Sequence, residues 1–220
     1  MFDRPAPPVS RKEGAVALLV AVALASALVW TARTPDAGAS WRLAFVGVHL
    51  VASGALILWL RCRAPGVGLV ILGAVLLRLV ALPMDPVLSD DGYRYLWDGG
   101  LVLEGVSPYA TRPSAHVRSD GPATELLERM NSPEYYSVYP PASQAVFAVA
   151  AAAPTWRLQW IWLKVLLGCA ELLGVWLLLR VCGPRAGALY AWSPLAVIEV
   201  AGQGHTEGLV IGGLGLILWA

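Results

Sequence analysis

Long apolar runs constrain the fold of this chain more strongly than any other feature of its sequence. A helix needs about 20 mostly apolar residues to cross the hydrocarbon core of a bilayer, with about 17 as the lower limit. The runs that meet this length are residues 14–31, 41–60, 66–83 and 158–180, and residues 186–200 are marginal. The sequence therefore predicts an all-α membrane protein, built as a polytopic bundle of transmembrane helices.

The last apolar run, residues 208–220, stops at Ala220 without a polar cap or a basic flank. A helix that stops within lipid is unfinished. We therefore expect this chain to be the N-terminal part of a longer protein, with further spans beyond Ala220. The alternative is a truncated, non-catalytic membrane fragment, and the sequence that follows Ala220 would distinguish the two.

Composition supports a membrane protein and excludes some functions. Hydrophobic residues make up 57% of the chain and charged residues only 14%, which is far more apolar than a soluble domain. Nine of the fifteen acidic residues lie between Asp85 and Glu134, against four arginines, so no basic face for nucleic acid is expected. The chain has three cysteines, Cys62, Cys169 and Cys182, and they do not have the spacing of metal ligands. This odd number predicts neither a disulfide framework nor a zinc site.

Basic residues set the expected topology, because short cytoplasmic loops are enriched in Lys and Arg. Arg4, Arg11 and Lys12 place the tail, residues 1–13, in the cytoplasm. The apolar run behind them is too long for a typical signal peptide and reads as a retained helix. Arg61 and Arg63 place the second short loop inside as well. Three helices within residues 14–83 then put the polar segment 84–157 on the outer side.

Residues 142–153 are apolar but only about a dozen long, which favours a helix lying on the outer face over a span. If they did span, Arg180 and Arg185 would lie outside, against the charge rule. With an outer-face helix, the chain crosses inward and outward again within residues 158–220. Residues 202–208 then share the outer side with residues 89–99. The rest of the outer loop is rich in proline, with a short helical candidate at 122–131.

Two adjacent carboxylates stand where hydrocarbon gives way to water, in the string S-D-D-G-Y-R-Y-L-W-D-G at 89–99. Each disfavours ionisation of the other, so Asp90 and Asp91 point to a proton, a cation or a hydroxyl-rich ligand. One of them could serve as general base, and together they could bind a divalent cation such as Mg or Mn. Adjacent side chains diverge, so one is expected to meet the substrate while the other caps the following turn. The alternative is a solvated loop anchored by interfacial aromatics.

Other polar and aromatic residues are candidates for binding a substrate. Tyr93, Tyr95 and Trp97 have a spacing that suits stacking on a sugar ring, and would equally suit interfacial anchoring. Further candidates are Arg94 and Asp98 in the same string, Tyr139 and Gln144 in V-Y-P-P-A-S-Q, and Glu199, His205 and Glu207 around the glycine-rich string G-Q-G-H-T-E-G at 202–208. That glycine-rich string also suits a simple turn between helices.

Three charged residues fall inside predicted spans. Arg78 lies near the outer end of the third span, where a charge is a functional candidate by default and a lipid phosphate would be its natural ligand. Snorkelling to the interface is the alternative. Lys164 and Glu171 are seven residues apart and share a helical face, where they would pair through neighbours or line one cavity.

Several of these strings occur in an order that resembles a known superfamily. The strings are S-D-D-G-Y-R-Y-L-W-D-G, G-V-S-P-Y (105–109), V-Y-P-P-A-S-Q (138–144) and Y-A-W-S-P-L-A-V-I-E-V-A-G-Q-G-H-T-E-G (190–208). Over about residues 66–220 the chain resembles bacterial, mannosyltransferase-like members of the GT-C superfamily, which are integral-membrane glycosyltransferases that use polyprenyl-phosphate sugars. Gly100, Ser107, Ser193 and Thr206-Glu207 depart from the usual pattern, so the resemblance does not specify the sugar.

The resemblance implies an active site on the extracytoplasmic side of the bacterial inner membrane. An Asp of the first large outer loop would act as base or metal ligand, which maps onto Asp91 or Asp90, and a short outer-face helix would follow Pro-Pro. We therefore hypothesise inverting transfer of a hexose, mannose-like, from a polyprenyl-phosphate donor to a lipid-linked or cell-envelope glycan. Asp91 would accept the proton, Asp90 would support it, and Arg78 and Arg94 would stabilise the leaving phosphate. The alternative is a lipid or solute transporter or flippase, with Arg78, Lys164 and Glu171 as an intramembrane relay.

Overall fold

The computed structural model describes residues 7–33, 39–116 and 121–220. In this part of the chain all regular secondary structure is helical, apart from an isolated bridge between Pro8 and Ala64, which confirms the all-α prediction. The elements are α1 (Arg11–Arg33), α2 (Ala39–Cys62), α3 (Val67–Ala81), α4 (Asp91–Leu103), η1 (Pro113–Ala115), α5 (Ala123–Arg129), α6 (Pro141–Ala151), α7 (Trp156–Ala191), α8 (Pro194–Ala196), η2 (Val197–Gly202) and α9 (Glu207–Trp219).

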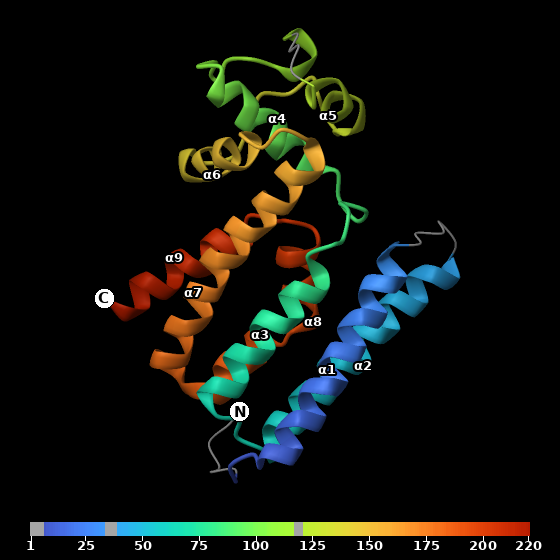
Figure 1. Ribbon diagram of the computed structural model, residues 1–220, viewed down its shortest axis with the longest axis vertical. Coiled ribbons are helices and arrows are strands. Elements are labelled where there is room, and N and C mark those ends of the chain that lie inside the picture. Colours follow the sequence, from blue (N-terminus) through green and yellow to red (C-terminus); the bar gives the residue numbers. More distant parts are fainter. Residues whose placement is uncertain (1–6, 34–38, 117–120) are drawn as a thin grey trace.

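The helices form two stacked parts (Figure 1). We call α1, α2, α3, α7, α8, η2 and α9 the bundle, and α4, α5 and α6 with their connections the cap. Each part has its own buried cluster: the bundle's is built on residues such as Leu77 and Trp192, and the cap's on Trp97 and Phe147. Helix α7 rises from the bundle to the cap, so its first turns are shared by both parts (Figure 1).

Two described helical segments are long and apolar enough to cross a membrane, Leu43–Cys62 and Trp156–Ala191. The second is bent, because Gly183 has a φ of 81° and Pro184 follows it. The predicted helix 186–200 is wrong as one continuous element. The chain leaves α7 at Ala191, restarts at Pro194 and then forms the π-helical η2. Proline lacks an amide N–H, so it begins a new helix more readily than it continues one.

The cap contains more helix than the sequence predicts. The short helix expected at 122–131 appears as α5, and the outer-face helix expected at 142–153 appears as α6, beginning at Pro141. Helix α4 was not predicted, because its glycines suggest a loop. It forms because the cap buries nearly all of it, and Gly99 lies so close to α6 that an added Cβ would be 2.2 Å from the carbonyl oxygen of Phe147.

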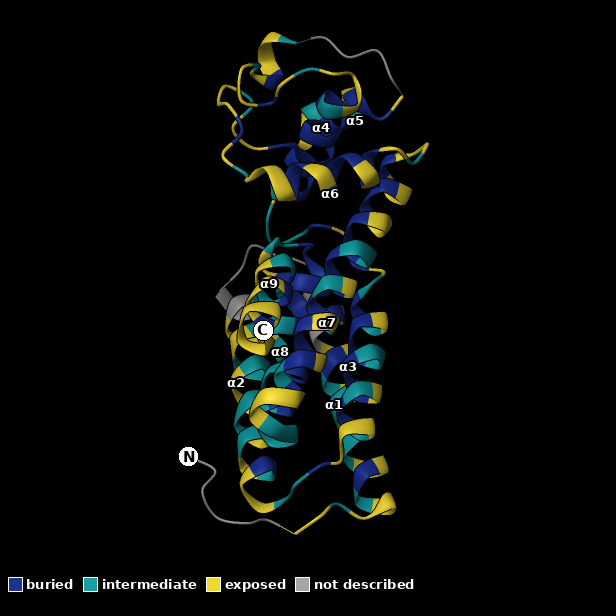
Figure 2. Cartoon of the chain, turned by 90° about the vertical axis from the view of Figure 1, so that its left-hand side faces the viewer, coloured by how far each residue is buried: buried dark blue, intermediate teal, exposed yellow. Residues whose placement is uncertain are grey.

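The outward faces of the bundle are apolar. Large exposed hydrophobic side chains occur on every long bundle helix, for example Leu19 on α1, Leu50 on α2, Leu72 on α3, Trp176 on α7 and Ile217 on α9. Figure 2 shows exposed positions along the outside of the helices, with buried positions facing inward. Such a large apolar surface is unusual for a soluble monomer and marks a face that contacts a membrane or another protein.

Candidate functional site at the junction of cap and bundle

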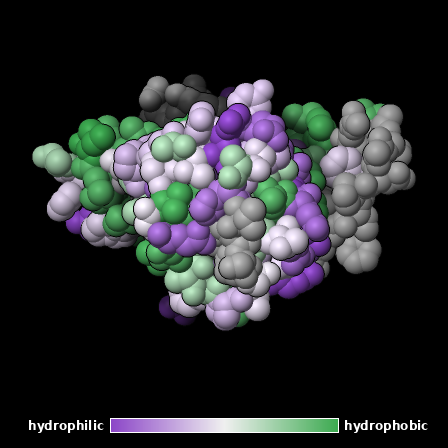
Figure 3. All heavy atoms as spheres, turned by 90° about the horizontal axis from the view of Figure 1, so that it is seen from above, coloured by the Kyte–Doolittle hydropathy of each residue, from purple (hydrophilic) through white to green (hydrophobic). Residues whose placement is uncertain are grey.

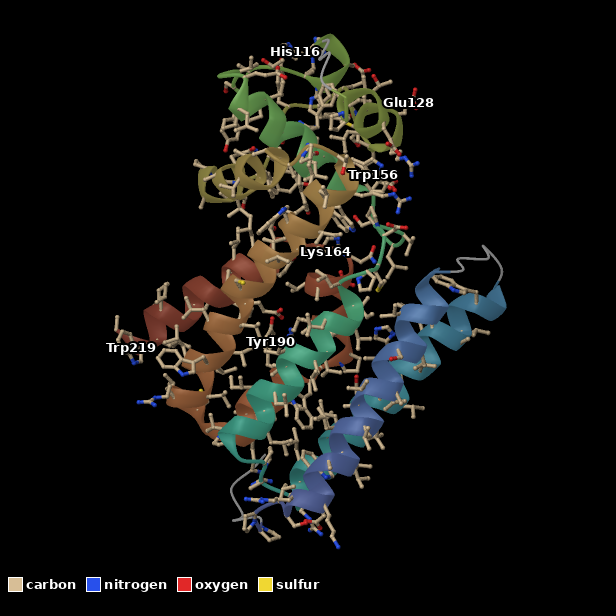
Figure 4. All side chains as sticks on the ribbon, viewed as in Figure 1. His116, Glu128, Trp156, Lys164, Tyr190 and Trp219 are labelled. Carbon is tan, nitrogen blue, oxygen red and sulfur yellow. The ribbon has the colours of Figure 1, made fainter. Side chains whose placement is uncertain are left out.

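The segment that connects α3 to α4, residues 82–90, is held against the bundle by three long side chains. Trp160 Nε1 donates a hydrogen bond to the carbonyl of Met84 at 2.8 Å, and Lys164 Nζ donates to the carbonyls of Leu82 and Met84. Gln203 Oε1 accepts from the Leu88 amide at 2.8 Å. Figure 4 shows Lys164 at the cap end of α7, directly below the cap. These contacts fix the position at which α4 begins.

Trp160 also brings together the two polar clusters that are far apart in the sequence. Its indole ring packs on Gly92 of α4, where an added Cβ would lie 2.3 Å from Cζ3. The same ring packs on Gly204, where the corresponding distance to Cη2 is 2.7 Å. Asp91 and His205 are the chain neighbours of these two glycines. The strings 89–99 and 202–208 therefore meet at one junction, as the predicted topology requires.

Asp91 and Asp90 have different surroundings. Asp91 stands in the first turn of α4, is half-buried, and accepts a hydrogen bond at Oδ1 from Nδ2 of Asn131 at 3.2 Å. Asp90 occupies the N-cap position and is exposed, but its side chain makes no capping hydrogen bond. The predicted capping role is therefore wrong, and only Asp91 is positioned by a side-chain partner.

A divalent cation prefers several oxygen ligands in a defined shell. The described residues contain no group of three or more His, Cys, Asp and Glu side chains that could hold a metal. One oxygen of Asp91 already accepts the amide of Asn131. The role of Asp90 and Asp91 as metal ligands stays a prediction.

His205 and Glu199 form a closely bonded pair beside Asp91. His205 Nδ1 lies 2.7 Å from Glu199 Oε2, while His205 Nε2 is buried and has no protein partner among the described residues. The hydrogen bond to Glu199 raises the pKa of His205, and the charges of Glu207 and Asp91 act in the same direction. Glu199 belongs to the π-helical turn η2, a form of helix often found at functional sites.

Two tyrosines complete the junction on the cap side. Tyr95 stacks on Phe147 with ring centroids 4.6 Å apart and meets Tyr139 edge-on at 4.7 Å. Burial raises the pKa of Tyr139, and the charge of Asp91 adds to the shift. Burial also raises the pKa of Tyr95, with smaller contributions from Tyr139, Asp91 and Glu207. The charges of Asp91 and Glu207 both act on Tyr95, and the charge of Asp91 also acts on Tyr139.

Several residues predicted to bind a ligand instead hold the cap together. Arg94 Nε pairs with Asp98 Oδ1 at 2.8 Å and Arg94 Nη2 donates to the Tyr135 carbonyl at 2.9 Å. Gln144 Nε2 donates to Asp98 Oδ2 at 3.3 Å and to Ser137 Oγ at 2.7 Å. Asp98 is fully buried. Arg94, Asp98 and Gln144 therefore support the cap, in place of the predicted ligand contacts.

The aromatic residues of the string are also packed inward. Trp97 is only 1% exposed, and Tyr93 lies 5.9 Å from Trp156 between ring centroids, with the guanidinium of Arg129 over both rings. Neither Tyr93 nor Trp97 presents an open face for stacking on a sugar. The packing of Tyr93 depends on partners in α5 and α7, which the alternating pattern of the string does not reveal.

Arg78 is buried in an ion pair and does not reach an interface. Its Nε and Nη2 bond to the two carboxylate oxygens of Glu171 at 3.1 and 2.8 Å, and its Nη1 donates to the Ala191 carbonyl. Tyr190 OH donates to Glu171 Oε1 at 2.9 Å, and Figure 4 shows Tyr190 within the bundle. Because these donors are occupied, both the predicted phosphate contact and the snorkelling alternative are wrong for Arg78. Lys164 and Glu171 bind different partners. Glu171 joins α7 to α3 through Arg78, and Lys164 joins α7 to the segment that follows α3.

Comparisons with protein families, with curated proteins and with solved structures gave no match for this chain. The GT-C resemblance therefore rests on the strings of its own sequence. What the structure adds is the junction of Asp91, His205, Glu199 and Glu207. Two of its supporting residues, Trp160 and Asn131, were not predicted, because one lies in an apolar run and the other in a proline-rich loop.

The His205–Glu199 pair predicts a pH dependence of stability. The pKa of His205 is raised above its usual 6.5 in the folded protein, mainly by Glu199. Its stabilising contribution is therefore fully present below about pH 6.5 and is lost as the pH rises through the folded pKa. We expect the melting temperature of the wild type to fall over this range, and the Glu199→Gln variant to show a smaller fall in thermal-shift measurements.

A matched control is Glu128→Gln, an exposed carboxylate on the cap (Figure 4). This variant should keep the wild-type dependence on pH. An equal fall of the melting temperature in wild type and Glu199→Gln would show that the pair does not contribute.

Proposed function

We propose that this protein is a membrane hexosyltransferase of the GT-C type. It takes a hexose, mannose-like, from a polyprenyl-phosphate donor and transfers it to a hydroxyl of a lipid-linked or cell-envelope glycan. The observation that carries the proposal is the junction: the half-buried Asp91 meets the His205–Glu199 pair through Trp160, at one end of a helix bundle with apolar outer faces.

The distribution of charge supports a membrane-embedded bundle with the cap outside. At the end opposite the cap, Arg63 pairs with Glu13 at 2.9 Å, and Arg185 donates to the carbonyls of Leu60 and Arg61. Arg11 and Lys12 lie at the start of α1, at the same end. Basic residues are enriched on the cytoplasmic side of membrane proteins, which supports an extracytoplasmic placement of the cap. Viewed from above, the cap shows hydrophilic side chains over the middle of its face (Figure 3).

The proposed reaction is a single in-line displacement. The acceptor hydroxyl loses its proton to the carboxylate of Asp91 as its oxygen bonds to the anomeric carbon. The bond from that carbon to the phosphate oxygen breaks on the opposite face, and the electron pair leaves with the polyprenyl phosphate. The configuration at the anomeric carbon is therefore inverted. Asn131 orients Asp91 through its hydrogen bond to Oδ1.

The leaving phosphate gains negative charge, and a cation near it lowers the barrier. Arg78 was the expected cation, but its guanidinium is bonded to Glu171 and Ala191. We assign this role to protonated His205, whose Nε2 has no protein partner in the described part of the chain. The raised pKa of His205 favours the charged imidazolium at neutral pH.

A transporter with an intramembrane relay is the second reading, and the geometry favours it less. A relay needs groups that can change their protonation or partners. Arg78, Glu171 and Tyr190 instead bond to one another, and Lys164 bonds to the carbonyls of Leu82 and Met84. These contacts support a structural role within the bundle.

The proposal is tested by reconstituting the protein in proteoliposomes with a polyprenyl-phosphate mannose that carries a radiolabelled sugar. We expect the label to appear in a glycan acceptor with inverted anomeric configuration, as read by NMR of the product. Movement of labelled lipid across the bilayer without glycan product would support the transporter. Transfer from a nucleotide sugar in place of the polyprenyl phosphate would contradict the proposed donor.

A further inference from the structure

The bundle contains a large apolar cavity, which extends from Lys12 and Arg63 at the end opposite the cap to Val197 and Ile198 of η2. It has a volume of about 700 Å³ and lies between α1 and α2 on one side and α3, α8 and η2 on the other. Its walls include Ala21 and Ala25 of α1 and Ala52 and Ala55 of α2, opposite the ring of Trp192. This size falls within the range of about 300–1,000 Å³ found for small-molecule sites.

The cavity follows from the size of the side chains that face it. Alanines on α1 and α2 reach only a short distance toward the rest of the bundle, and Trp59 stacks on Trp192 at 5.6 Å, at one wall of the space. Apolar cavities do not hold water well, because water finds no hydrogen-bond partners there. An empty space would also forfeit the van der Waals contacts of its lining. An apolar occupant therefore fits the cavity better than solvent.

The cytoplasmic mouth of the cavity is basic. Lys12 and Arg63 line it together with Glu13, and Glu13 is bonded to Arg63 at 2.9 Å. Lys12 is exposed, as is the neighbouring Arg61. The hydrogen bonds to Ser10 and Arg63 lower the pKa of Glu13, so this carboxylate is ionised and neutralises only part of the positive charge. The remaining charge is complementary to an anionic group.

We propose that this cavity binds an anionic phospholipid of the cytoplasmic leaflet, with one acyl chain inside and the phosphate beside Lys12 and Arg63. The lipid fills the space between the α1–α2 hairpin and the rest of the bundle, and so fixes the hairpin in place. The inference rests on the membrane placement of the bundle in the proposed function, but not on sugar transfer. The proposed phosphate position, beside Lys12 and Arg63, is at the opposite end of the molecule from Asp91.

The test is native mass spectrometry of the intact protein, titrated with phosphatidylglycerol and with phosphatidylcholine. We expect one phosphatidylglycerol to bind at least about tenfold more tightly than phosphatidylcholine. The Lys12→Gln variant should weaken phosphatidylglycerol binding about fivefold, as expected for loss of one cation at an anionic headgroup. The Arg61→Gln variant, which removes a neighbouring cation outside the lining, should have little effect.

A second pair of variants tests the apolar part of the site. Ala21→Trp fills the cavity and should lower phosphatidylglycerol binding at least about tenfold, whereas Ala23→Trp changes an exposed residue of the same helix outside the lining and should not. Ala55→Phe repeats the block from α2, should the first variant fail to fold. Equal binding of the two lipids, or full binding by both cavity-filled variants, would overturn the proposal. The absence of a one-to-one complex with either lipid would also overturn the proposal, because it would show that another protein segment closes the cavity to lipid.

Discussion

The Asp91→Asn variant should transfer hexose at least about 100-fold more slowly than the wild type, because it loses the proposed general base. The amide has nearly the same shape as the carboxylate but cannot accept the proton of the acceptor hydroxyl. An interaction made in the transition state affects kcat more than KM, so the KM for the donor should change little. Initial rates with labelled polyprenyl-phosphate mannose, at saturating acceptor, measure both constants.

Asp90→Asn is the matched control for this prediction. Asp90 is exposed and has no side-chain capping bond, so its loss should change the rate by only a few fold. Equal melting temperatures of the two variants would show that both are folded. If both variants retained the wild-type rate, the assignment of the base would be wrong, and a larger loss in Asp90→Asn would exchange the roles of the two residues.

The Glu171→Ala variant should be about 3–5 kcal/mol less stable than the wild type, since it breaks a buried ion pair by removing one partner. Glu171 is fully buried and bonds to the guanidinium of Arg78 and the hydroxyl of Tyr190. Without it, a buried positive charge and a phenol lose their acceptor at the contact between α3 and α7. Reversible unfolding of the purified protein in mixed micelles measures the difference in free energy.

Replacing both partners separates the charge from the packing. The double variant Arg78→Met with Glu171→Leu should recover most of the lost stability, because well-packed apolar residues can replace a buried ion pair at little cost. Glu125→Gln is a surface control, since Glu125 pairs with Arg129 on the exposed face of α5 and such pairs contribute little. A Glu171→Ala variant as stable as the wild type would show that Arg78 finds another partner or water.

These two predictions concern different parts of the molecule. Asp91 lies at the junction of cap and bundle, whereas Arg78 and Glu171 hold α3 against α7 inside the bundle. If the Glu171→Ala variant is less stable but its folded fraction transfers hexose at the wild-type rate, Glu171 has a structural role that is separate from the proposed role of Asp91. This result would also count against the transporter reading, in which Arg78 and Glu171 carry the function.

The local properties of this chain could be predicted from its sequence. The four longest apolar runs all form helices, and Pro140 followed by Pro141 marks the beginning of α6. The sequence also predicts that residues 89–99 and 202–208 lie on the same side, from an expected topology, and in the structure the two strings meet on the ring of Trp160. These features depend on composition and order along the chain, which are visible without partners.

Only the tertiary structure decided which side chains meet. Arg78 and Glu171 are 93 residues apart, and nothing in either neighbourhood identifies the other as its partner. Helix α4 forms because the cap buries residues 91–103, whose glycines give this segment little helical propensity of its own. Trp160 reads as one more apolar residue of a span until Gly92 and Gly204 are seen on its ring. Pairing between distant segments depends on the direction of each side chain after folding, and a one-dimensional pattern does not contain that direction.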